Sequence, residues 1–349
     1  MFDLDAILRR NIRDLKPYSS ARDEFKGEAD IFLDANENSI GSPMLKWYNR
    51  YPDPLQIKVK EKISFIKKVP VNQIFLGNGS DEPIDLLYRC FCEPGTDEAI
   101  IFPPTYGMYE VSANINNIKL VRVPLLSNFQ IDMQSLEMAI TPMTKIIWIC
   151  SPNNPTGNSI DRHDIEMILN NFDGIVVLDE AYVNFSRQRS FVADLNEYPN
   201  LVVLQTLSKA WGLAGIRLGM AFASSEIINV FNKVKPPYNI SEPVQELALK
   251  ALDEVGQVND MIQQLVSSRI SLVSALLQSG KVVQVFPSDA NFILAVFHDA
   301  KSMYEYLLNQ GIVVRDRSNV ILCENALRIT VGTETENKKL IEAIENFII

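Results

Sequence analysis

Histidine and basic charge are scarce in this 349-residue sequence, and each shortage removes a class of function. Only two histidines, His163 and His298, are present, and they lie in unrelated segments. The sequence therefore lacks the grouped histidines that a zinc site or a serine–histidine catalytic triad requires. The 33 lysines and arginines are outnumbered by 43 aspartates and glutamates, which gives a net charge of −10. Because nucleic-acid binding needs a basic face, this charge argues against a nucleic-acid partner.

Metal-ligand clusters, long apolar runs and nucleotide-binding loops are also missing. The four cysteines, Cys90, Cys92, Cys150 and Cys323, have no metal-ligand spacing, so we expect reduced thiols in the core and no bound metal. No run of about 18 apolar residues is present, and the first residues, MFDLDAILRR, have no apolar signal core. Neither GxGxxG nor GxxxxGK[ST] occurs, which excludes the common nucleotide-binding loops. We therefore expect a cytoplasmic protein without a membrane partner.

What the sequence does contain is a regular alternation of short apolar runs with helical or loop segments. Runs of this kind lie at 74–76, 98–102, 119–125, 144–150, 174–179, 200–205 and 219–223. The alternation predicts an α/β fold in which helices cover both faces of a mostly parallel seven-stranded sheet. The chain is 47% hydrophobic, and its length is sufficient for two packed domains.

A segment with two prolines, VKPPYNIS at 234–241, interrupts this alternation and marks the expected change of domain. It is followed by a long amphipathic stretch from 242 to about 278 and then by the strand-like runs VVQVF, NFILAVF, GIVVR and ALRITVG. Helices at 299–310 and 333–348 are expected to cover this smaller sheet. The expected segments are an arm that packs on the small domain, a large cofactor-binding domain and a small α+β domain, at 1–30, 31–235 and 236–349.

A lysine lies in the segment TLSKAWGLAGIRLG at 206–219, directly after the strand-like run at 200–205. The carboxyl ends of such strands are where α/β enzymes gather their functional groups. A lysine that is removed from water gives up its proton more easily and attacks carbonyl groups. Lys209 is therefore a candidate nucleophile, with an ordinary solvated lysine as the alternative.

Two further strand-like runs also end in polar side chains. Asp179 follows IVVL, with Tyr182 close behind it, and Asn154 lies in the turn SPNNPTG after TKIIWIC. A carboxylate at the end of a buried strand needs a cationic partner, which the protonated ring of pyridoxal phosphate would supply. Tyr182 and Asn154 could then bond to the phenolic oxygen of that ring. Simpler interpretations stay open, because an acid can cap the next helix and asparagines and prolines form rigid turns.

The phosphate of such a cofactor needs hydrogen-bond donors, and the segment GNGSDEPIDLL offers them as a glycine turn that opens a helix. Ser80 suits the N-cap, and the amides of the first helical turn point outward. Thr206, Ser208 and Arg217 would complete the cradle with two hydroxyls and a fixed charge. Tyr106, in FPPTYGMY, is placed to stack on the ring, with a core tyrosine as the alternative.

Taken together, these segments resemble the fold type I pyridoxal-phosphate-dependent aminotransferases of class II, and within them the histidinol-phosphate aminotransferases. The likeness extends over nearly the whole chain, in the same order. The segments that carry it are LKPYSSARDE at 15–24, LDANENS at 33–39, RYPDP at 50–54, GNGSDEPIDLL at 77–87, PPTYGMY at 103–109, SPNNPTGN at 151–158, LDEAYVNF at 178–185, TLSKAWGLAGIRLG at 206–219 and LRITVGT at 327–333. Single segments are shared widely, but their combination is specific.

The resemblance implies a role for each matched residue. Lys209 would form the internal aldimine and move a proton between substrate and cofactor, Asp179 would hold the pyridine nitrogen, and Tyr182 would bind the phenolic oxygen. The other residues implied around the cofactor are Gly79, Ser80, Asp81, Tyr106, Asn154, Thr206, Ser208, Arg217 and, from the second subunit of a homodimer, Tyr51. Each active site would then be shared between two chains.

The resemblance also implies a reaction and the residues that bind its substrates. The expected reaction is ping-pong transfer of the amino group of L-histidinol phosphate to 2-oxoglutarate, which gives imidazole acetol phosphate and L-glutamate in histidine biosynthesis. Arg328 resembles the arginine that binds the anionic end of both substrates, because a planar guanidinium pairs with carboxylate or phosphate. Arg315 and Tyr18 are further candidates for the phosphate, and Asn154 is also expected to contact the substrate.

Two other activities of the same cofactor class stay open at this point. Threonine-phosphate decarboxylases and aromatic amino acid aminotransferases share the lysine, aspartate and arginine segments. A cofactor-binding regulator would need a DNA-reading module, which about thirty residues ahead of the large domain cannot provide. The sequence departs from the family pattern at Gln205, where arginine is usual, and at Trp211, where phenylalanine is usual. Neither departure removes a catalytic group.

Overall fold

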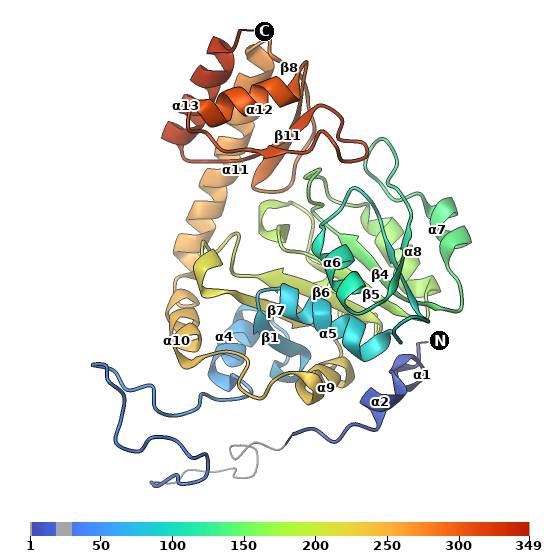
Figure 1. The fold of residues 1–349 in the computed structure, drawn as a ribbon, viewed down its shortest axis with the longest axis vertical. Helices are drawn as coiled ribbons and strands as arrows, with labels where there is room; N and C mark the ends of the chain where they lie inside the picture. Colours follow the sequence, from blue (N-terminus) through green and yellow to red (C-terminus); the bar gives the residue numbers. More distant parts are fainter. Residues whose placement is uncertain (1, 19–29, 349) are drawn as a thin grey trace.

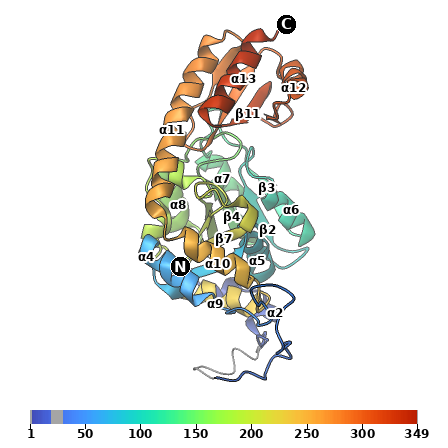
Figure 2. The ribbon, with the colours of Figure 1, turned by 90° about the vertical axis from the view of Figure 1, so that its left-hand side faces the viewer.

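The computed structural model describes residues 2–18 and 30–348 and contains two sheets joined by a long helix (Figure 1). The larger sheet has seven strands and the smaller sheet has four. In Figure 2 the long helix runs along one side of the molecule, from the layer of the large sheet to the small sheet. The predicted α/β class, with a mostly parallel large sheet and a smaller α+β part, is confirmed.

The strands of the large sheet form at the apolar runs of the sequence. They are β1 (Ile74–Asn78), β2 (Glu98–Ile101), β3 (Lys119–Arg122), β4 (Thr144–Cys150), β5 (Ile175–Asp179), β6 (Leu201–Thr206) and β7 (Leu218–Phe222). Their order is β1-β7-β6-β5-β4-β2-β3. The pairs from β6 to β3 are parallel, whereas β7 is antiparallel to both of its neighbours. The carboxyl ends of β4, β5 and β6 therefore meet at one edge, where Cys150 is the register partner of Asp179.

Helices cover both faces of the large sheet because its central strands are apolar on both faces. Val176 of β5 belongs to the core on one face, and its neighbour Val177 belongs to the core on the other. The covering helices are α4 (Ile57–Lys67), α5 (Asp81–Phe91), α6 (Met108–Ile115), α7 (Met133–Ala139), α8 (Arg162–Asn171) and α9 (Ser225–Val234). Short 3₁₀ turns lie between them, at η1 (Val71–Gln73), η2 (Val183–Phe185), η3 (Phe191–Asp194) and η4 (Ala214–Ile216).

The smaller sheet is antiparallel in the order β10-β11-β9-β8, with its own apolar core. Its elements are β8 (Val282–Val285), β9 (Phe292–Phe297), β10 (Arg315–Asp316), β11 (Ala326–Thr330), α12 (Ala300–Asn309) and α13 (Glu334–Asn346). The amphipathic stretch expected from 242 to 278 is divided into α10 (Glu242–Ala251) and α11 (Val255–Gln278). Helix α10 packs against α4 of the large layer, while α11 reaches β8 and β9. The division at 235/236 stays a proposal, because the first helix after it still contacts the large layer.

The described part of the amino-terminal arm lies on the large layer. Helices α1 (Leu4–Ile7) and α2 (Arg10–Arg13) approach α5 and α9, where the Arg9 amide donates to the Cys90 carbonyl at 3.0 Å. Lys233 of α9 donates to the carbonyl of Ile12 at 2.7 Å, and the Ile12 side chain is buried in the same apolar core. The expectation that the arm packs on the small domain is therefore wrong for residues 2–18, and residues 19–29 lie outside the described part.

The segment that precedes α4 exposes an unusual number of large apolar side chains. In Figure 1 this blue segment runs out from the large layer instead of packing within it. The exposed side chains are Ile31, Leu33, Ile40, Met44, Leu45 and Trp47. A surface of this kind is typical of a protein–protein contact.

The four cysteines were expected to be reduced thiols in the core. All four cysteines are buried and unpaired, as predicted. In residues 2–18 and 30–348, no group of three or more histidine, cysteine or acidic side chains is arranged to hold a metal ion. Among the same residues, no helix is both long and apolar enough to cross a bilayer.

Candidate active site

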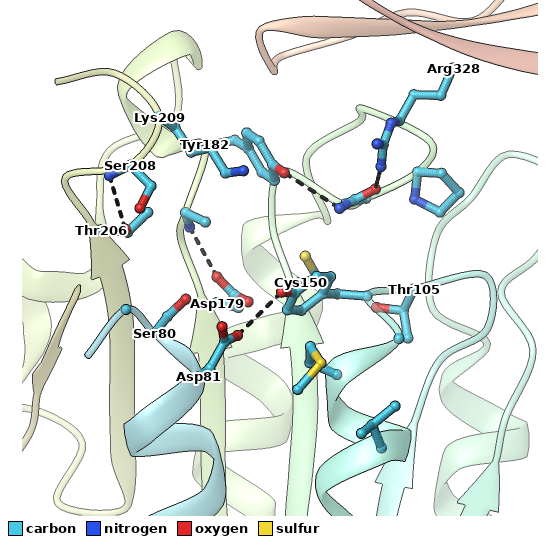
Figure 3. Close-up of a pocket in the computed structure, with 18 of the residues that line it drawn as sticks. Ser80, Asp81, Thr105, Cys150, Asp179, Tyr182, Thr206, Ser208, Lys209 and Arg328 are labelled. Carbon is cyan, nitrogen blue, oxygen red and sulfur yellow. Dashed lines mark hydrogen bonds between the residues drawn. The ribbon is translucent and has the colours of Figure 1, made fainter. Parts of the chain in front are cut away.

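A cavity of about 770 Å³ lies where the carboxyl ends of β4, β5 and β6 face the small sheet (Figure 3). It is lined by every residue that the sequence places at the site except Tyr18 and Tyr51. These lining residues are Gly79, Ser80, Asp81, Tyr106, Asn154, Asp179, Tyr182, Thr206, Ser208, Lys209, Arg217, Arg315 and Arg328. Segments that are up to 249 positions apart in the chain, from Gly79 to Arg328, therefore share one cavity.

Asp179 ends strand β5 at the floor of the cavity and is only 3% exposed. Its Oδ2 accepts a hydrogen bond from the Tyr109 hydroxyl at 2.6 Å, and its Oδ1 accepts one from the Ala181 amide at 3.0 Å. Burial raises the pKa of this carboxyl, and the two donated bonds oppose that rise. Within the described residues no lysine or arginine lies within ion-pair distance of it. A buried carboxylate of this kind is suited to a cationic ligand.

Lys209 follows strand β6 and lies across the cavity from Asp179 in Figure 3. Its Nζ lies 5.5 Å from the centre of the Tyr182 ring. The residue is exposed to the cavity rather than buried, but loss of water still lowers the pKa of its amine, and the positive charge of Arg328 lowers it further. The direction of this pKa agrees with a nucleophilic amine, although the complete burial that the sequence suggested is absent.

A chain of polar contacts links the floor of the cavity to the small sheet. The Asn154 amide nitrogen donates to the Tyr182 hydroxyl at 3.4 Å, and the Arg328 guanidinium donates to the Asn154 side-chain oxygen. The ring of Phe292 supports both ends, since it packs edge-on against Tyr182 with 5.0 Å between centroids and lies 5.4 Å from Arg328 Cζ. Tyr182 and Asn154 are therefore close enough to bind one oxygen atom of a ligand together.

The glycine turn after β1 forms the opposite wall of the cavity. Gly79 has a φ of +67°, and its amide donates to the Arg217 carbonyl at 2.8 Å. The turn is pressed against β7 so closely that a Cβ on Gly219 would lie 2.2 Å from the Gly79 carbonyl carbon. Glycine is required at both positions, because any side chain would displace the turn. Ser80 occupies the N-cap position of α5 as predicted, but its side chain makes no capping hydrogen bond.

The positive charge of this wall is partly balanced within the protein. Arg217 Nη2 lies 3.2 Å from Asp81 Oδ2, and the Tyr106 hydroxyl donates to Asp81 Oδ1 at 3.2 Å. The carboxylate of Asp81 would repel a phosphate, so its backbone amide at the start of α5 is the group suited to an anion. Thr206 accepts a hydrogen bond from the Ser208 amide at 3.0 Å, which shapes the loop that carries Lys209.

The residues present fit pyridoxal phosphate on three independent grounds. A lysine with a lowered pKa, a buried carboxylate without a cationic partner among the described residues, and a glycine turn beside an arginine all face one cavity. They match, in turn, an aldehyde, a protonated ring nitrogen and a phosphate group. A Cβ on Gly79 would lie 2.6 Å from Arg217 Nη2, so the missing side chain lets this guanidinium lie directly beside the turn.

Sequence reasoning missed one arginine of the cavity. Arg317 lines it together with Arg315 and Arg328, and in the described part of the chain none of the three has a carboxylate within ion-pair distance. Within residues 2–18 and 30–348, the buried Nε of Arg317 and the buried Oγ of Ser318 have no hydrogen-bond partner. The sequence carried no clear signal for Arg317, because it follows the two-residue strand β10, whose pairing with β11 is too short to read from periodicity.

A second missed residue is Tyr109, which bonds directly to Asp179 from helix α6. It is the second residue of α6, whereas Tyr106 lies just before that helix begins. The two rings pack edge to face with their centroids 5.6 Å apart. The segment PTYGMY therefore supplies two tyrosines to the site, where the sequence analysis assigned a role to the first alone.

Tyr18 and Tyr51 do not reach the cavity of their own chain. Tyr18 is 75% exposed and lines a separate hollow beside Leu15 and Lys233. Tyr51 is 51% exposed and stacks on Tyr238 at 4.4 Å between centroids. Any contribution of Tyr51 to a site therefore has to be made to another chain.

The two departures from the family pattern both lie behind the cavity. Gln205 is buried, and its amide nitrogen donates to Glu180 at 2.8 Å and to the Ser190 hydroxyl at 3.1 Å. The Glu180 carboxylate also accepts from the Phe191 amide at 2.8 Å. Trp211 is buried and borders the same small void as Gln205. Both side chains support the ends of β5 and β6 without entering the cavity.

Comparison with known proteins agrees with this geometry. The family described as aminotransferase class I and II matches residues 44–344. A histidinol-phosphate aminotransferase of Cytophaga hutchinsonii is 54% identical over 346 residues, which cover 99% of each chain. The crystal structure of the histidinol-phosphate aminotransferase from Clostridium acetobutylicum is similar with a TM-score of 0.79 and 25% identity, over 85% of this chain and 90% of that one. The Sinorhizobium meliloti enzyme, solved in complex with pyridoxal-5'-phosphate, shares the fold with a TM-score of 0.78 and 21% identity, over 85% of this chain and 82% of that one.

Proposed function

The chain belongs to the class I and II aminotransferases and, among them, to the histidinol-phosphate aminotransferases, and we propose that it transfers the amino group of L-histidinol phosphate to 2-oxoglutarate. The products are imidazole acetol phosphate and L-glutamate, formed in two half-reactions that use the same site in turn. The observation that carries the proposal is one cavity that combines Lys209, Asp179 and three arginines without carboxylate partners among the described residues. The arginines favour substrates with strongly anionic ends.

The cofactor of this family is pyridoxal 5'-phosphate, which, when bound, withdraws electrons from the substrate carbon that loses its proton. Asp179 would hold the ring nitrogen and keep it protonated, because a buried carboxylate stabilises a positive charge at short range. Tyr182 and Asn154 would bind the phenolic oxygen, and Tyr106 would cover the ring. The residues proposed for the phosphate are the backbone of Gly79, Ser80 and Asp81, the hydroxyls of Ser80, Thr206 and Ser208, and the guanidinium of Arg217.

The proposed proton carrier is the amine of Lys209. Its lowered pKa increases the neutral fraction, which is the form that accepts a proton from the substrate carbon. In the first half-reaction Nζ would take the proton from the substrate carbon and pass it to another atom of the bound substrate and cofactor. In the second half-reaction it would move a proton in the opposite direction. Asp179 would stay ionised in both half-reactions and would hold the protonated ring nitrogen in place.

Substrate binding is proposed to depend on the small sheet. Arg328 would bind a carboxylate of glutamate in one half-reaction and the phosphate of histidinol phosphate in the other, since its planar fork pairs with both groups. Its contact with Asn154 sets the direction of the guanidinium. Arg315 and Arg317 would add charge for the phosphate. Because residues of the large and the small sheet layers both line the cavity, bound substrate would contact both.

We also propose a homodimer with shared active sites. Two features support it: Tyr51 does not line the cavity of its own chain, and the apolar side chains between Ile31 and Trp47 are exposed.

Mixing Lys209→Ala and Tyr51→Ala chains tests the shared site, because a hybrid would hold one site with both residues intact. Random pairing should restore about a quarter of the wild-type activity from two impaired parents. A mixture no more active than its parents would refute sharing through Tyr51. Tyr18 is not proposed as a ligand of its own chain's site.

A coupled assay tests the reaction. Purified protein with the cofactor receives histidinol phosphate and 2-oxoglutarate, and glutamate formation is followed with glutamate dehydrogenase. Threonine phosphate and phenylalanine are supplied in parallel, with carbon dioxide release measured for the former. Glutamate formation with histidinol phosphate as the preferred donor is the expected result. Carbon dioxide from threonine phosphate, or preference for phenylalanine, would replace the proposal with a decarboxylase or an aromatic aminotransferase. The cytoplasmic location stays a prediction, which cell fractionation tests.

A further inference from the structure

Within the described residues, the shortest hydrogen bond to the Asp179 carboxylate comes from a tyrosine that does not line the cavity. The Tyr109 hydroxyl donates to Asp179 Oδ2 at 2.6 Å, and both side chains are buried. The Ala181 amide, at 3.0 Å from Oδ1, is the other protein donor to this carboxylate in the described residues. Each oxygen of Asp179 is therefore held by one donor, and the donor on Oδ2 is a side chain that a single substitution can remove.

The position of the Tyr109 hydroxyl is itself determined by packing. The ring is stacked on Trp148 of β4, with 4.7 Å between centroids and 18° between planes. The Tyr88 hydroxyl from α5 donates to the Tyr109 carbonyl at 3.0 Å, so a second buried phenol bonds to this residue without contacting Asp179. A buried tyrosine usually finds a partner for its hydroxyl, and here the partner is the carboxylate at the floor of the cavity. Neither the ring nor the hydroxyl of Tyr109 is free to turn elsewhere.

We propose that Tyr109 is a positioning residue for Asp179, whose hydroxyl keeps the carboxylate ionised and correctly directed for the ring nitrogen of the cofactor. A hydrogen bond donated to the charged form of an acid stabilises that form. Without this donor, burial alone would favour the neutral acid, and a neutral acid does not hold a cation. The inference rests on the proposed function only through the identity of the cofactor, and it does not depend on which amino substrate is used.

Other ionisable groups also face Asp179 and have to be kept constant in any test. Asp81 from α5 disfavours the charged carboxylate, and Lys209 from the loop after β6 favours it. The remaining ionisable neighbours are phenols or a thiol from the surrounding elements: Tyr106, Tyr109, Cys150 and Tyr182. Burial raises the pKa of each of these four groups, so they stay neutral around pH 7.

The test measures cofactor binding rather than turnover. The cofactor is removed from the full-length protein and titrated back into wild-type protein and Tyr109→Phe, and its dissociation constant is measured between pH 5 and pH 9. Phenylalanine keeps the ring on Trp148 and removes the hydroxyl. We expect about tenfold weaker binding at pH 7, because a hydrogen bond to a charged group is lost. Removal of the donor raises the pKa of Asp179, so the pH below which binding weakens should increase by about one.

A matched control separates positioning from packing. Tyr88→Phe removes a neighbouring buried hydroxyl that bonds to the Tyr109 carbonyl and not to Asp179, so the pH midpoint of cofactor binding should equal that of the wild type. Tyr109→Phe combined with Asp179→Asn should bind the cofactor as Asp179→Asn alone does. A wild-type midpoint in Tyr109→Phe, or an equal shift in Tyr88→Phe, overturns the proposal. If the transaminase assay fails while the cofactor titration succeeds, the proposed reaction is rejected and the role of Tyr109 stands.

Discussion

The guanidinium of Arg328 and the side-chain amide of Asn154, 174 positions apart in the chain, are joined by a hydrogen bond. Arg328 belongs to the small sheet, and Asn154 belongs to the loop after β4 of the large sheet. Because Asn154 also contacts Tyr182, the contact connects the groups proposed for the cofactor with those proposed for the substrate. A ligand bound at Arg328 is thereby held at a defined distance from the floor of the cavity.

Substitution of Arg328 tests this connection. Arg328→Gln should raise the KM for histidinol phosphate and for glutamate by about 30-fold or more, since the loss of charge-assisted hydrogen bonds costs about 2 kcal/mol or more. Steady-state kinetics on both substrates provide the measurement, with Arg122→Gln on exposed strand β3 as the control. Unchanged KM values for both substrates would reject the assignment of Arg328 to substrate anions.

Arg317 should distinguish the two substrates from each other. Arg317 lines the same cavity as Arg315 and has no carboxylate within ion-pair distance among the described residues, so its charge is available to a phosphate dianion. Arg317→Gln is expected to raise the KM for histidinol phosphate by about tenfold and to change the KM for glutamate much less. Equal effects on both substrates would indicate a general loss of positive potential, and no effect would remove Arg317 from the site.

Removal of the Lys209 amine should abolish turnover. In Lys209→Ala the nucleophile and the proton carrier are both lost, and we expect the rate to fall by about three orders of magnitude or more. Borohydride reduction of the wild-type protein with cofactor should label the peptide that contains Lys209, as mass spectrometry can show. Lys233→Ala, on helix α9, is the control and should keep both turnover and labelling. Normal turnover in Lys209→Ala would reject the mechanism.

The pKa of Lys209 gives a pH prediction with a defined sign. Loss of water and the charge of Arg328 both lower this pKa below its ordinary value of 10.5. In the cofactor-free protein, amine-selective labelling of Lys209 should therefore begin at a lower pH than labelling of exposed lysines such as Lys338. Arg328→Gln removes one of the causes that lower this pKa, so the labelling midpoint of Lys209 should rise. If the labelling midpoint of Lys209 does not change in Arg328→Gln, the charge of Arg328 does not influence the pKa of Lys209.

The large sheet and most of the site could be predicted because the same runs of residues encode both. Apolar runs such as 144–150 and 174–179 form strands, and in parallel strands the polar residues that follow them meet at one edge. The division of 242–278 at Leu252–Glu254 was not visible, because both helices continue one amphipathic pattern. The position of the arm on α5 and α9 depends on tertiary contacts of Ile12, which carry no local signal.

The side chains that the sequence did not reveal act through other side chains or depend on strand pairing. Tyr109, in helix α6, bonds to Asp179 at the end of β5. Gln205, in β6, bonds to Glu180, which directly follows β5. Arg317 reaches the cavity because β10 pairs with β11, a pairing of two residues that is too short to read from periodicity. Residues that belong to a known segment could be assigned from that segment, whereas residues that support them needed the structure.

Helix α11 has a mechanical consequence for the arginines of the small sheet. Its 24 residues form one rod of about 36 Å, which contacts η2 beside the large sheet and β8 and β9 in the small one. A tilt of about 5° at its first turn would carry its last turn sideways by about 3 Å. A rotation that is slight at the large layer is therefore multiplied along the helix before it reaches the sheet that carries Arg328.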